Sequence, residues 1–400
     1  MPGESPLSMM RPAAPSLRSK PDARQAPRRR RWRILTPVAI LIALTGVWVW
    51  LWYYAASIAD RTLAGWVERE AAAGRLYACG TETIGGFPLG IRADCAALAA
   101  EIKDSQPPYA VKAKAVAVTA QVYQPTLLTG DIVGPLTLAE LGRPPSFSAD
   151  WTRARVSVRG VPPDPQSVSV ELVGPHLDRV GGAVGNGGAT IVQAKRADLQ
   201  GRVVAGSARN HPVVEVTFHL AAALAPGLHP LLAAPVDVEF DGVLRGFKDL
   251  SPKPWSERFR EMQAGGGDIT VKSLRIGQGG SIIVGAGTLK INQQGRLDGL
   301  ARVAVVGIEQ LAPLLDFDRM LGQSLDRLSG TDGAEQGVSA LDRLVPGLST
   351  ALRESLIENL KKMGQPATVE QRPAIVLPLR FADGAVYLGM LRLGEVPPLF

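Results

Sequence analysis

The sequence predicts a β-rich (α+β) protein: an N-terminal transmembrane helix followed by a large, mostly antiparallel β domain with a few covering amphipathic helices. Two observations lead to this fold class. A stretch of 26 residues without charge, 34–59, follows a basic N-terminus. Much of the remaining chain alternates apolar and polar residues with period two, as half-buried antiparallel strands do. The 43 glycines and 31 prolines exceed their usual shares of about 7% and about 5%, which favours short strands joined by turns.

The net charge of +7 comes entirely from the N-terminal tail. Residues 1–33 contain nine basic and two acidic residues, so the other 35 basic and 35 acidic residues sum to zero. We therefore expect no basic face on the domain and no nucleic-acid partner. Because the tail has no apolar periodicity, we predict that residues 1–33 form a disordered basic tail.

The uncharged stretch predicts a transmembrane helix over residues 34–56. Twenty-six helical residues at about 1.5 Å each exceed the roughly 30 Å hydrocarbon core of a bilayer. Aromatic side chains that suit a membrane–water interface gather at its C-terminal end: Trp48, Trp50, Trp52, Tyr53 and Tyr54. Arginines flank its N-terminal end: Arg28, Arg29, Arg30, Arg31 and Arg33. By the positive-inside rule, the N-terminus is expected in the cytoplasm.

A cleaved signal peptide is the alternative, because a basic region followed by an apolar one describes both. Its apolar region would span about 7–15 residues, and here bulky aromatic residues precede the small residues at 55–57. We therefore favour a retained single-pass anchor in the inner membrane of a Gram-negative-type cell, with the bulk of the chain in the periplasm. The helical pattern continues through residues 57–75 as a stalk.

A β-rich domain is predicted over residues 76–400, with a subdivision near residue 250. The expected strands before that point are 111–118, 154–158, 167–172, 213–220 and 236–240. A short helix follows, and further strands are expected at 268–276, 281–284, 287–291, 299–306, 374–381 and 385–389. Two leucine-rich amphipathic stretches, 308–328 and 341–363, are expected to cover one face of a sheet, with lipid contact as the alternative.

The two cysteines, Cys79 and Cys95, are the sharpest local signal. An even, closely spaced pair in an exported domain is expected to be oxidised. The nearest histidine in sequence is His176, which disfavours a metal site, and a redox pair would more typically be Cys-x-x-Cys. We predict a structural disulfide that contributes about 3 kcal/mol. Inside the loop, residues 84–91 predict a tight turn with Phe87 packed beneath it, or an apolar loop that faces lipid.

No catalytic or cofactor-binding residue is predicted. The four histidines lack metal-binding spacing, and the glycine-rich stretches 181–188 and 285–287 lack the Gly-Lys-Ser/Thr of a phosphate loop. There is no Gly-x-Ser-x-Gly elbow, and no paired carboxylates stand in a context that suggests acid–base work. We expect no cofactor, no metal and a non-enzymatic protein.

Three segments resemble a bacterial family known as domain of unknown function 2125: Gly85–Cys95, Pro254–Trp255 leading to Gly266–Thr270, and Leu377–Gly389. The resemblance implies a membrane-anchored envelope protein with no assigned activity, and it carries no catalytic residue. A fainter likeness links Gly287–Gly299 to AsmA-like envelope proteins, in which long β-structures are associated with lipid traffic.

The sequence therefore predicts a periplasmic module, tethered to the inner membrane, that binds a lipid or another apolar ligand through a β-sheet face. A scaffold or assembly factor for other envelope proteins is the first alternative. A hydrolase whose site is assembled from distant residues is the second.

Overall fold

The computed structural model describes residues 28–105, 107–161, 164–180, 189–228, 230–307, 364–389 and 391–400, together with residues 355, 358 and 362. Some predictions fall outside these residues. They concern the tail up to residue 27, the glycine-rich stretch 181–188, His229 and nearly all of the two leucine-rich stretches.

The first element is one helix, α1 (Arg28–Ala72), of 45 residues. It contains residues 34–56, predicted as a transmembrane helix, and the predicted stalk up to Ala72, with no break between them, and β1 follows at Arg75. From Leu35 to Ala72 the helix is long and apolar enough to cross a membrane. The chain divides into two compact units, Met1–Ala55 and Ala56–Phe400. The second unit therefore includes the last turns of α1.

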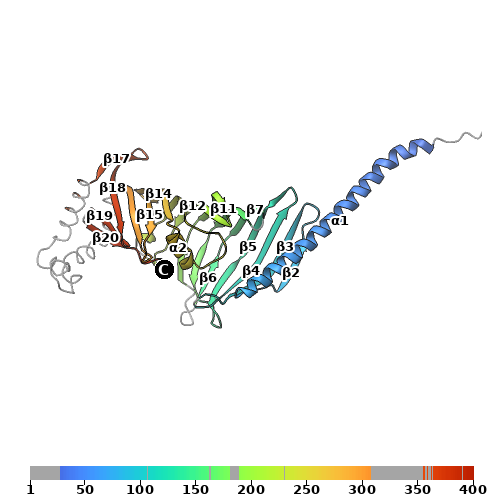
Figure 1. Ribbon diagram of the computed structural model, residues 1–400, viewed down its shortest axis with the longest axis horizontal. Coiled ribbons are helices and arrows are strands. Elements are labelled where there is room, and N and C mark those ends of the chain that lie inside the picture. Colours follow the sequence, from blue (N-terminus) through green and yellow to red (C-terminus); the bar gives the residue numbers. More distant parts are fainter. Residues whose placement is uncertain are drawn as a thin grey trace, which may run out of the picture. The chain divides into compact units, whose positions relative to one another are not determined.

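Among the residues that the structure describes, the β-rich domain is a single antiparallel sheet of 20 strands (Figure 1). The strands are β1 (Arg75–Ala78), β2 (Thr81–Gly85), β3 (Gly90–Ile102), β4 (Tyr109–Gln121), β5 (Gln124–Glu140), β6 (Phe147–Asp150), β7 (Arg153–Val161), β8 (Asp164–Val173), β9 (His176–Arg179) and β10 (Ala189–Gln193). They continue as β11 (Arg196–Ser207), β12 (Asn210–Ala223), β13 (Val236–Leu244), β14 (Asp268–Gln278), β15 (Ser281–Ile291), β16 (Leu297–Val306), β17 (Gln365–Val369), β18 (Arg372–Ala382), β19 (Ala385–Leu388) and β20 (Leu391–Glu395).

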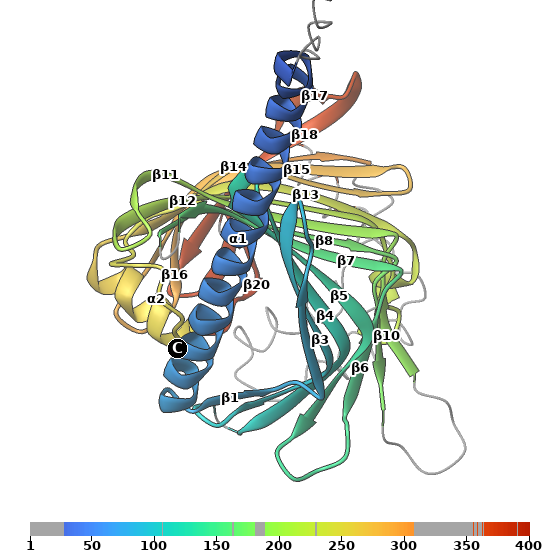
Figure 2. The ribbon, with the colours of Figure 1, turned by 90° about the vertical axis from the view of Figure 1, so that its right-hand side faces the viewer.

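The sheet is built largely as a meander, because most strands pair with those next to them in the chain. The central order is β3, β4, β5, β7, β8, β11, β12, β13, β14, β15, β16, β18, and its first strands can be followed in Figure 2. The short strand β6 pairs with the C-terminal part of β5, β9 pairs with β6, and β10 pairs with β9. Within the described residues, no pairing joins β1 or β2 at one edge to β20 at the other.

Two short helices complete the described fold: α2 (Trp255–Ala264) and the 3-10 helix η1 (Pro230–Ala233). Helix α2 packs on β15 and forms a buried cluster of Phe247, Met262 and Ile291. Among the described residues, two further buried clusters lie in the C-terminal strands. One centres on Leu377 and Leu388, and the other on Ile282, Val306 and Ala374.

Candidate functional site

The strand register brings apolar residues from ten strands into one continuous row across the sheet. Each residue of the row is paired with the next: Gly130, Val156, Val170, Leu199, Phe218, Phe240, Leu274, Gly285, Val303 and Leu377. Because side chains alternate between faces along a strand, residues paired in this way lie on the same face.

A second row lies two residues away along each strand and is also apolar throughout. It contains Ile132, Ala154, Leu172, Ala197, Leu220, Val238, Ile276, Ile283, Val305 and Ile375. On the other side of the first row, a third row has smaller residues, and three of its positions are glycines. Its members are Leu128, Val158, Val168, Gly201, Val216, Gly242, Val271, Gly287, Ala301 and Leu379. We call these three rows the apolar face.

Much of the apolar face is without a covering layer among the described residues. Apart from contacts between neighbouring strands, the main packing onto the sheet is that of α2 on β15. Leu199 is 44% exposed and Val168 is 39% exposed, although both sit in central strands of the sheet. Val118, which pairs with Gly130 and extends the first row into β4, is 41% exposed. Large aliphatic side chains on an open sheet face are typical of a binding surface.

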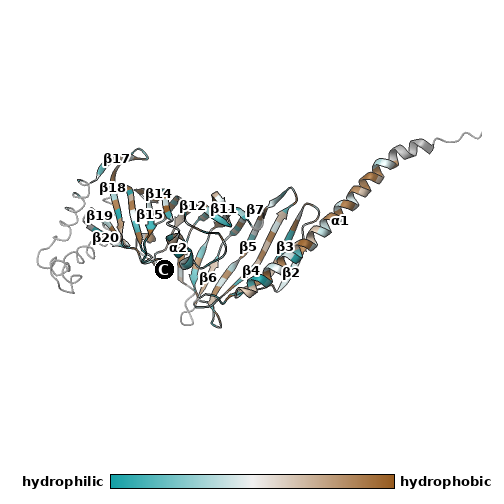
Figure 3. Ribbon diagram, viewed as in Figure 1, coloured by the Kyte–Doolittle hydropathy of each residue, from teal (hydrophilic) through white to brown (hydrophobic). Residues whose placement is uncertain are grey.

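The opposite face of the same strands is polar and is tied together by ion pairs. Arg155 lies 2.9 Å from Asp131 on the neighbouring strand, and Arg202 lies 2.5 Å from Glu215. Hydrogen bonds from Lys272 and Arg202 lower the pKa of Glu215. Along the central strands, brown apolar and teal polar residues therefore alternate in Figure 3. The sheet presents water-compatible groups on one side and hydrocarbon on the other.

Two of the hollows on the polar face have volumes of about 610 and 470 Å³ and lie over the central strands. Ser157, Ser169 and Thr217 contribute to the first, and Asp198, His219 and Glu239 to the second. Most of their charged groups are already paired within the chain; Asp198, for example, accepts a hydrogen bond from Arg196 at 2.5 Å. In the described part of the chain, no group of three or more His, Cys, Asp or Glu is arranged to hold a metal ion.

A compact group of charged residues fixes α2 to the preceding loop. Lys253 lies 3.1 Å from Asp249 and 3.2 Å from Glu261, and buried Arg258 lies 3.6 Å from both carboxylates. Hydrogen bonds from the hydroxyl and backbone N–H of Ser251 hold the pKa of Asp249 well below its usual range. Burial acts to raise the pKa of Glu261, but the Lys248 N–H and the Lys253 ammonium bring it below the ordinary value. Because every member is paired, the group holds α2 in place.

The predicted interfacial residues lie on α1 with their rings in contact. Trp50 and Tyr54 stack at 5.7 Å between ring centroids, and Trp52 meets Tyr53 edge to face at 5.2 Å. Trp50, Tyr53 and Tyr54 are all more than half exposed, and Trp48 is 39% exposed. The predicted arginines, 28–31 and 33, occupy the first turns of the same helix. Both sets of residues therefore lie on one continuous helix.

The end of α1 is joined to the sheet by a charged and an aromatic contact. Arg75 donates to Glu70 at 2.5 Å and to Asp104 at 3.1 Å, and the hydrogen bond to Glu70 raises the pKa of Arg75. One turn earlier, Trp66 packs on Tyr77 with ring centroids 4.9 Å apart. Burial raises the pKa of Tyr77. The last turns of α1 are thus fixed to β1.

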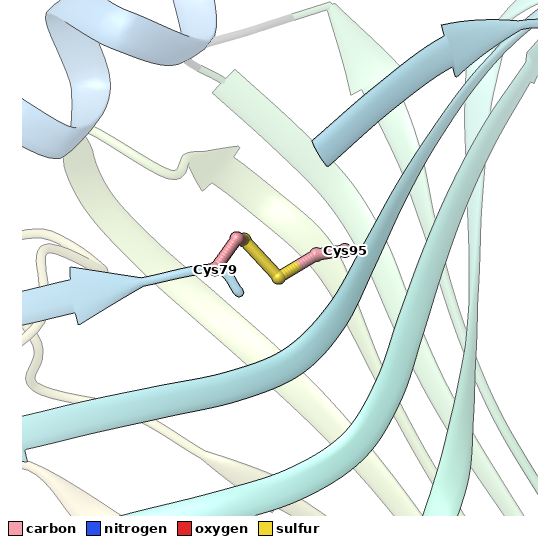
Figure 4. The surroundings of a disulfide bond; sticks show 2 residues. All are labelled: Cys79 and Cys95. Atoms are coloured by element: carbon pink, nitrogen blue, oxygen red, sulfur yellow. A yellow bond between two sulfur atoms is a disulfide. The ribbon is translucent and has the colours of Figure 1, made fainter. Parts of the chain in front are cut away.

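Cys79 and Cys95 form a disulfide bond with a Cα–Cα distance of 5.5 Å (Figure 4). Cys95 lies on β3 and pairs with Val116, which in turn pairs with Ile132 of the second apolar row. Cys79 lies in the connection between β1 and β2. The disulfide therefore links the first strands of the domain at the N-terminal end of the apolar face.

The sequence alone did not locate the apolar face, although the alternation of apolar and polar residues that produces it is present in single strands. Residues Val168, Val170 and Leu172 of β8 alternate visibly, and so do Val214, Val216 and Phe218 of β12. Which of these residues share a row depends on the register between strands. Of the histidines, His219 lies 3.6 Å from Asp198, and His176 lies 3.9 Å from Asp178.

The family comparison agrees with the resemblance drawn from the three sequence segments. The model of a family described as an uncharacterized protein conserved in bacteria (DUF2125) matches residues 52–397. The chain belongs to this family. No curated protein and no solved structure matches the chain, and the likeness to AsmA-like proteins is not shown. The match starts within α1 and includes the whole described sheet up to β20.

Proposed function

We propose that this member of the family is a non-enzymatic module, anchored in the inner membrane by α1, that binds the acyl chains of a lipid on its apolar face in the periplasm. The observation that supports this function best is the set of three continuous apolar rows, on a sheet whose other face is polar and ion-paired. A soluble domain gains stability by covering such surface, so an uncovered one is suited to a hydrophobic ligand.

The dimensions of the apolar face suit hydrocarbon chains. Ten strands at about 4.8 Å spacing extend about 40 Å along a row. An acyl chain occupies about half of the roughly 30 Å hydrocarbon core of a bilayer, so one row accommodates more than one chain. The rows contain only Gly, Ala, Val, Leu, Ile and Phe, and such side chains favour the non-directional burial of hydrocarbon.

The position of the domain next to a bilayer also favours a lipid ligand. A helix long and apolar enough to span a membrane precedes the sheet, with an arginine-rich start and an aromatic end. The arginine-rich start favours a cytoplasmic N-terminus, and the disulfide is consistent with an oxidising compartment. A lipid would then be available within a short distance of the sheet.

The test is mass spectrometry of the full-length protein extracted in mild detergent, before and after extraction with organic solvent. Wild-type protein is expected to carry a lipid that is enriched over the bulk membrane composition. Leu199→Glu places a charge on the apolar face and should reduce the bound lipid several-fold. Gln200→Glu adds the same charge at the adjacent residue on the polar face and should leave the lipid in place.

Absence of any enriched lipid, or equal loss from the two variants, would contradict lipid binding on this face. Recovery of another envelope polypeptide in place of lipid would favour the scaffold alternative. Recovery of the full-length protein in the soluble fraction after cell lysis without detergent would contradict membrane anchoring, independently of the lipid result.

A further inference from the structure

Two neighbouring hairpin turns expose large apolar side chains at one end of the sheet. Between β2 and β3, Phe87 is 50% exposed and Leu89 is 63% exposed. Between β4 and β5, Val122 is 44% exposed and Tyr123 is 67% exposed. The backbone N–H of Val122 donates to the carbonyl of Leu89 at 3.0 Å, so the two turns lie side by side. We call these four residues the apolar tips.

The composition of the tips is unusual for solvent-facing turns. Turns normally contain Gly, Pro, Asn, Asp and Ser with polar neighbours. Here no charged residue occurs from Ile84 to Ile91 or from Ala115 to Gly130. The expectation that Phe87 packs beneath its turn is also wrong, because half of its surface is exposed. Phe, Leu and Tyr at an exposed tip suit a membrane interface, where an aromatic ring meets hydrocarbon and a phenol meets water.

Contacts at the end of α1 show which way the helix runs beside β3. Glu70 pairs with Arg75, which lies opposite Ile102 of β3. Four residues earlier in the helix, Trp66 packs on Tyr77, which lies opposite Ala100. Followed backwards from Glu70 to Trp66, the helix therefore advances along β3 towards Gly90, where the apolar tips are.

We propose that the apolar tips insert into the interface of the bilayer that α1 spans, as a second membrane contact of the domain. This inference rests on the membrane anchoring in the proposed function but not on lipid binding by the apolar face. Two contacts restrict the orientation of the domain more than the anchor alone does, and they hold the β3–β5 end of the apolar face at the lipid surface.

The test uses full-length protein reconstituted in vesicles of phosphatidylethanolamine and phosphatidylglycerol. Because both native cysteines are in the disulfide, an introduced cysteine is the one free thiol for an environment-sensitive dye. Leu89→Cys and Tyr123→Cys place the dye on the tips, and Arg143→Cys places it in the turn at the opposite end of β5. Thr45→Cys places it on α1.

Dyes at Leu89 and Tyr123 are expected to shift their emission to the blue and to be quenched by nitroxide-labelled lipid, as at Thr45. The dye at Arg143 should keep water-like emission. If the dyes at both tips had water-like emission and were not quenched while the dye at Thr45 was quenched, the second membrane contact would be contradicted and anchoring by α1 would still be supported. An unquenched dye at Thr45 would overturn the anchor and, with it, this inference.

Discussion

Two parts of the first apolar row differ in burial although they share one sheet face. Leu377 in the C-terminal strands is 6% exposed, and it forms a buried cluster with Leu388. Leu199, in a central strand of the same row, is 44% exposed, and the buried residues of the three clusters all lie at position 247 or later in the chain. The same alternation of apolar and polar residues therefore makes a core in one region and an open surface in another.

The difference in burial implies that different interactions stabilise the C-terminal region and the central strands. In the C-terminal region, burial of side chains such as Met262 and Ile291 supplies the hydrophobic free energy of folding. In the central strands, backbone pairing and the ion pairs of the polar face accompany a surface that stays partly in water. We therefore expect substitutions in the first region to change stability most, and substitutions in the second to change ligand binding most.

The largest expected effect is that of Met262→Ala in α2. Met262 is 1% exposed, and truncating a fully buried methionine costs about 2–5 kcal/mol of unfolding free energy. Leu199→Ala removes a similar volume from a half-exposed position and should cost about 1 kcal/mol or less. Denaturant unfolding followed by circular dichroism measures both. Equal losses would remove the distinction between the two regions.

Removal of the disulfide should lower the unfolding free energy by about 3 kcal/mol, because the cross-link restricts the unfolded chain. The double variant Cys79→Ser with Cys95→Ser avoids leaving a free thiol. Thermal melting of oxidised wild type, reduced wild type and the variant forms the comparison. Reduction should reproduce the effect of the variant, and an unchanged melting temperature would show that the bond does not stabilise the N-terminal strands.

A smaller effect, about 1 kcal/mol, is expected for Asp249→Asn, because Asp249 is partly exposed and its hydrogen bonds are charge-assisted. The pKa of Asp249 is lower in the folded protein than in the unfolded chain. Its stabilisation is therefore present above a pH of about 4 and is lost as the pH falls through the folded pKa. The stability gap between wild type and variant should shrink from pH 7 to pH 3 in unfolding experiments. A gap that stayed constant or widened would contradict this assignment.

The smallest effect is expected for Arg202→Gln on the polar face. Arg202 pairs with Glu215, but its side chain is 66% exposed, and exposed ion pairs contribute little. Neither the melting temperature nor the lipid content should change measurably. A loss of bound lipid in this variant would indicate that the lipid binds on the polar face instead.

Strands with clean alternation, such as 167–172 and 213–220, were predictable from the sequence and lie within β8 and β12. β3 and β5 were not predicted. β3 contains the alanine-rich run 96–100, which lacks contrast between its faces, and β5 contains Gly130, Gly134 and Pro135, which resemble turn signals. Pairing with β4 on both sides overrides these local signals.

Only the general type of the candidate site was predictable. The sequence indicated a sheet face for an apolar ligand, but each row depends on a series of strand registers that joins residues up to about 250 positions apart, such as Gly130 and Leu377, and local periodicity does not encode these registers. The long apolar helix was predictable because length and composition alone define it, whereas the anchoring role of its aromatic and arginine residues stays a prediction. The exposure of Phe87 was not predictable, because a tight apolar turn fits either a packed or an open position.

Photo-crosslinking from the two faces of adjacent strands tests the central claim most directly. A photoreactive residue replaces Leu199 or Val168 on the apolar face, and Gln200 or Ser169 on the polar face, in the full-length protein within intact cells. Lipid adducts, identified by mass spectrometry after digestion, are predicted at Leu199 and Val168 and not at Gln200 and Ser169. Adducts at equal levels on both faces, or on the polar face alone, would contradict lipid binding by the apolar face.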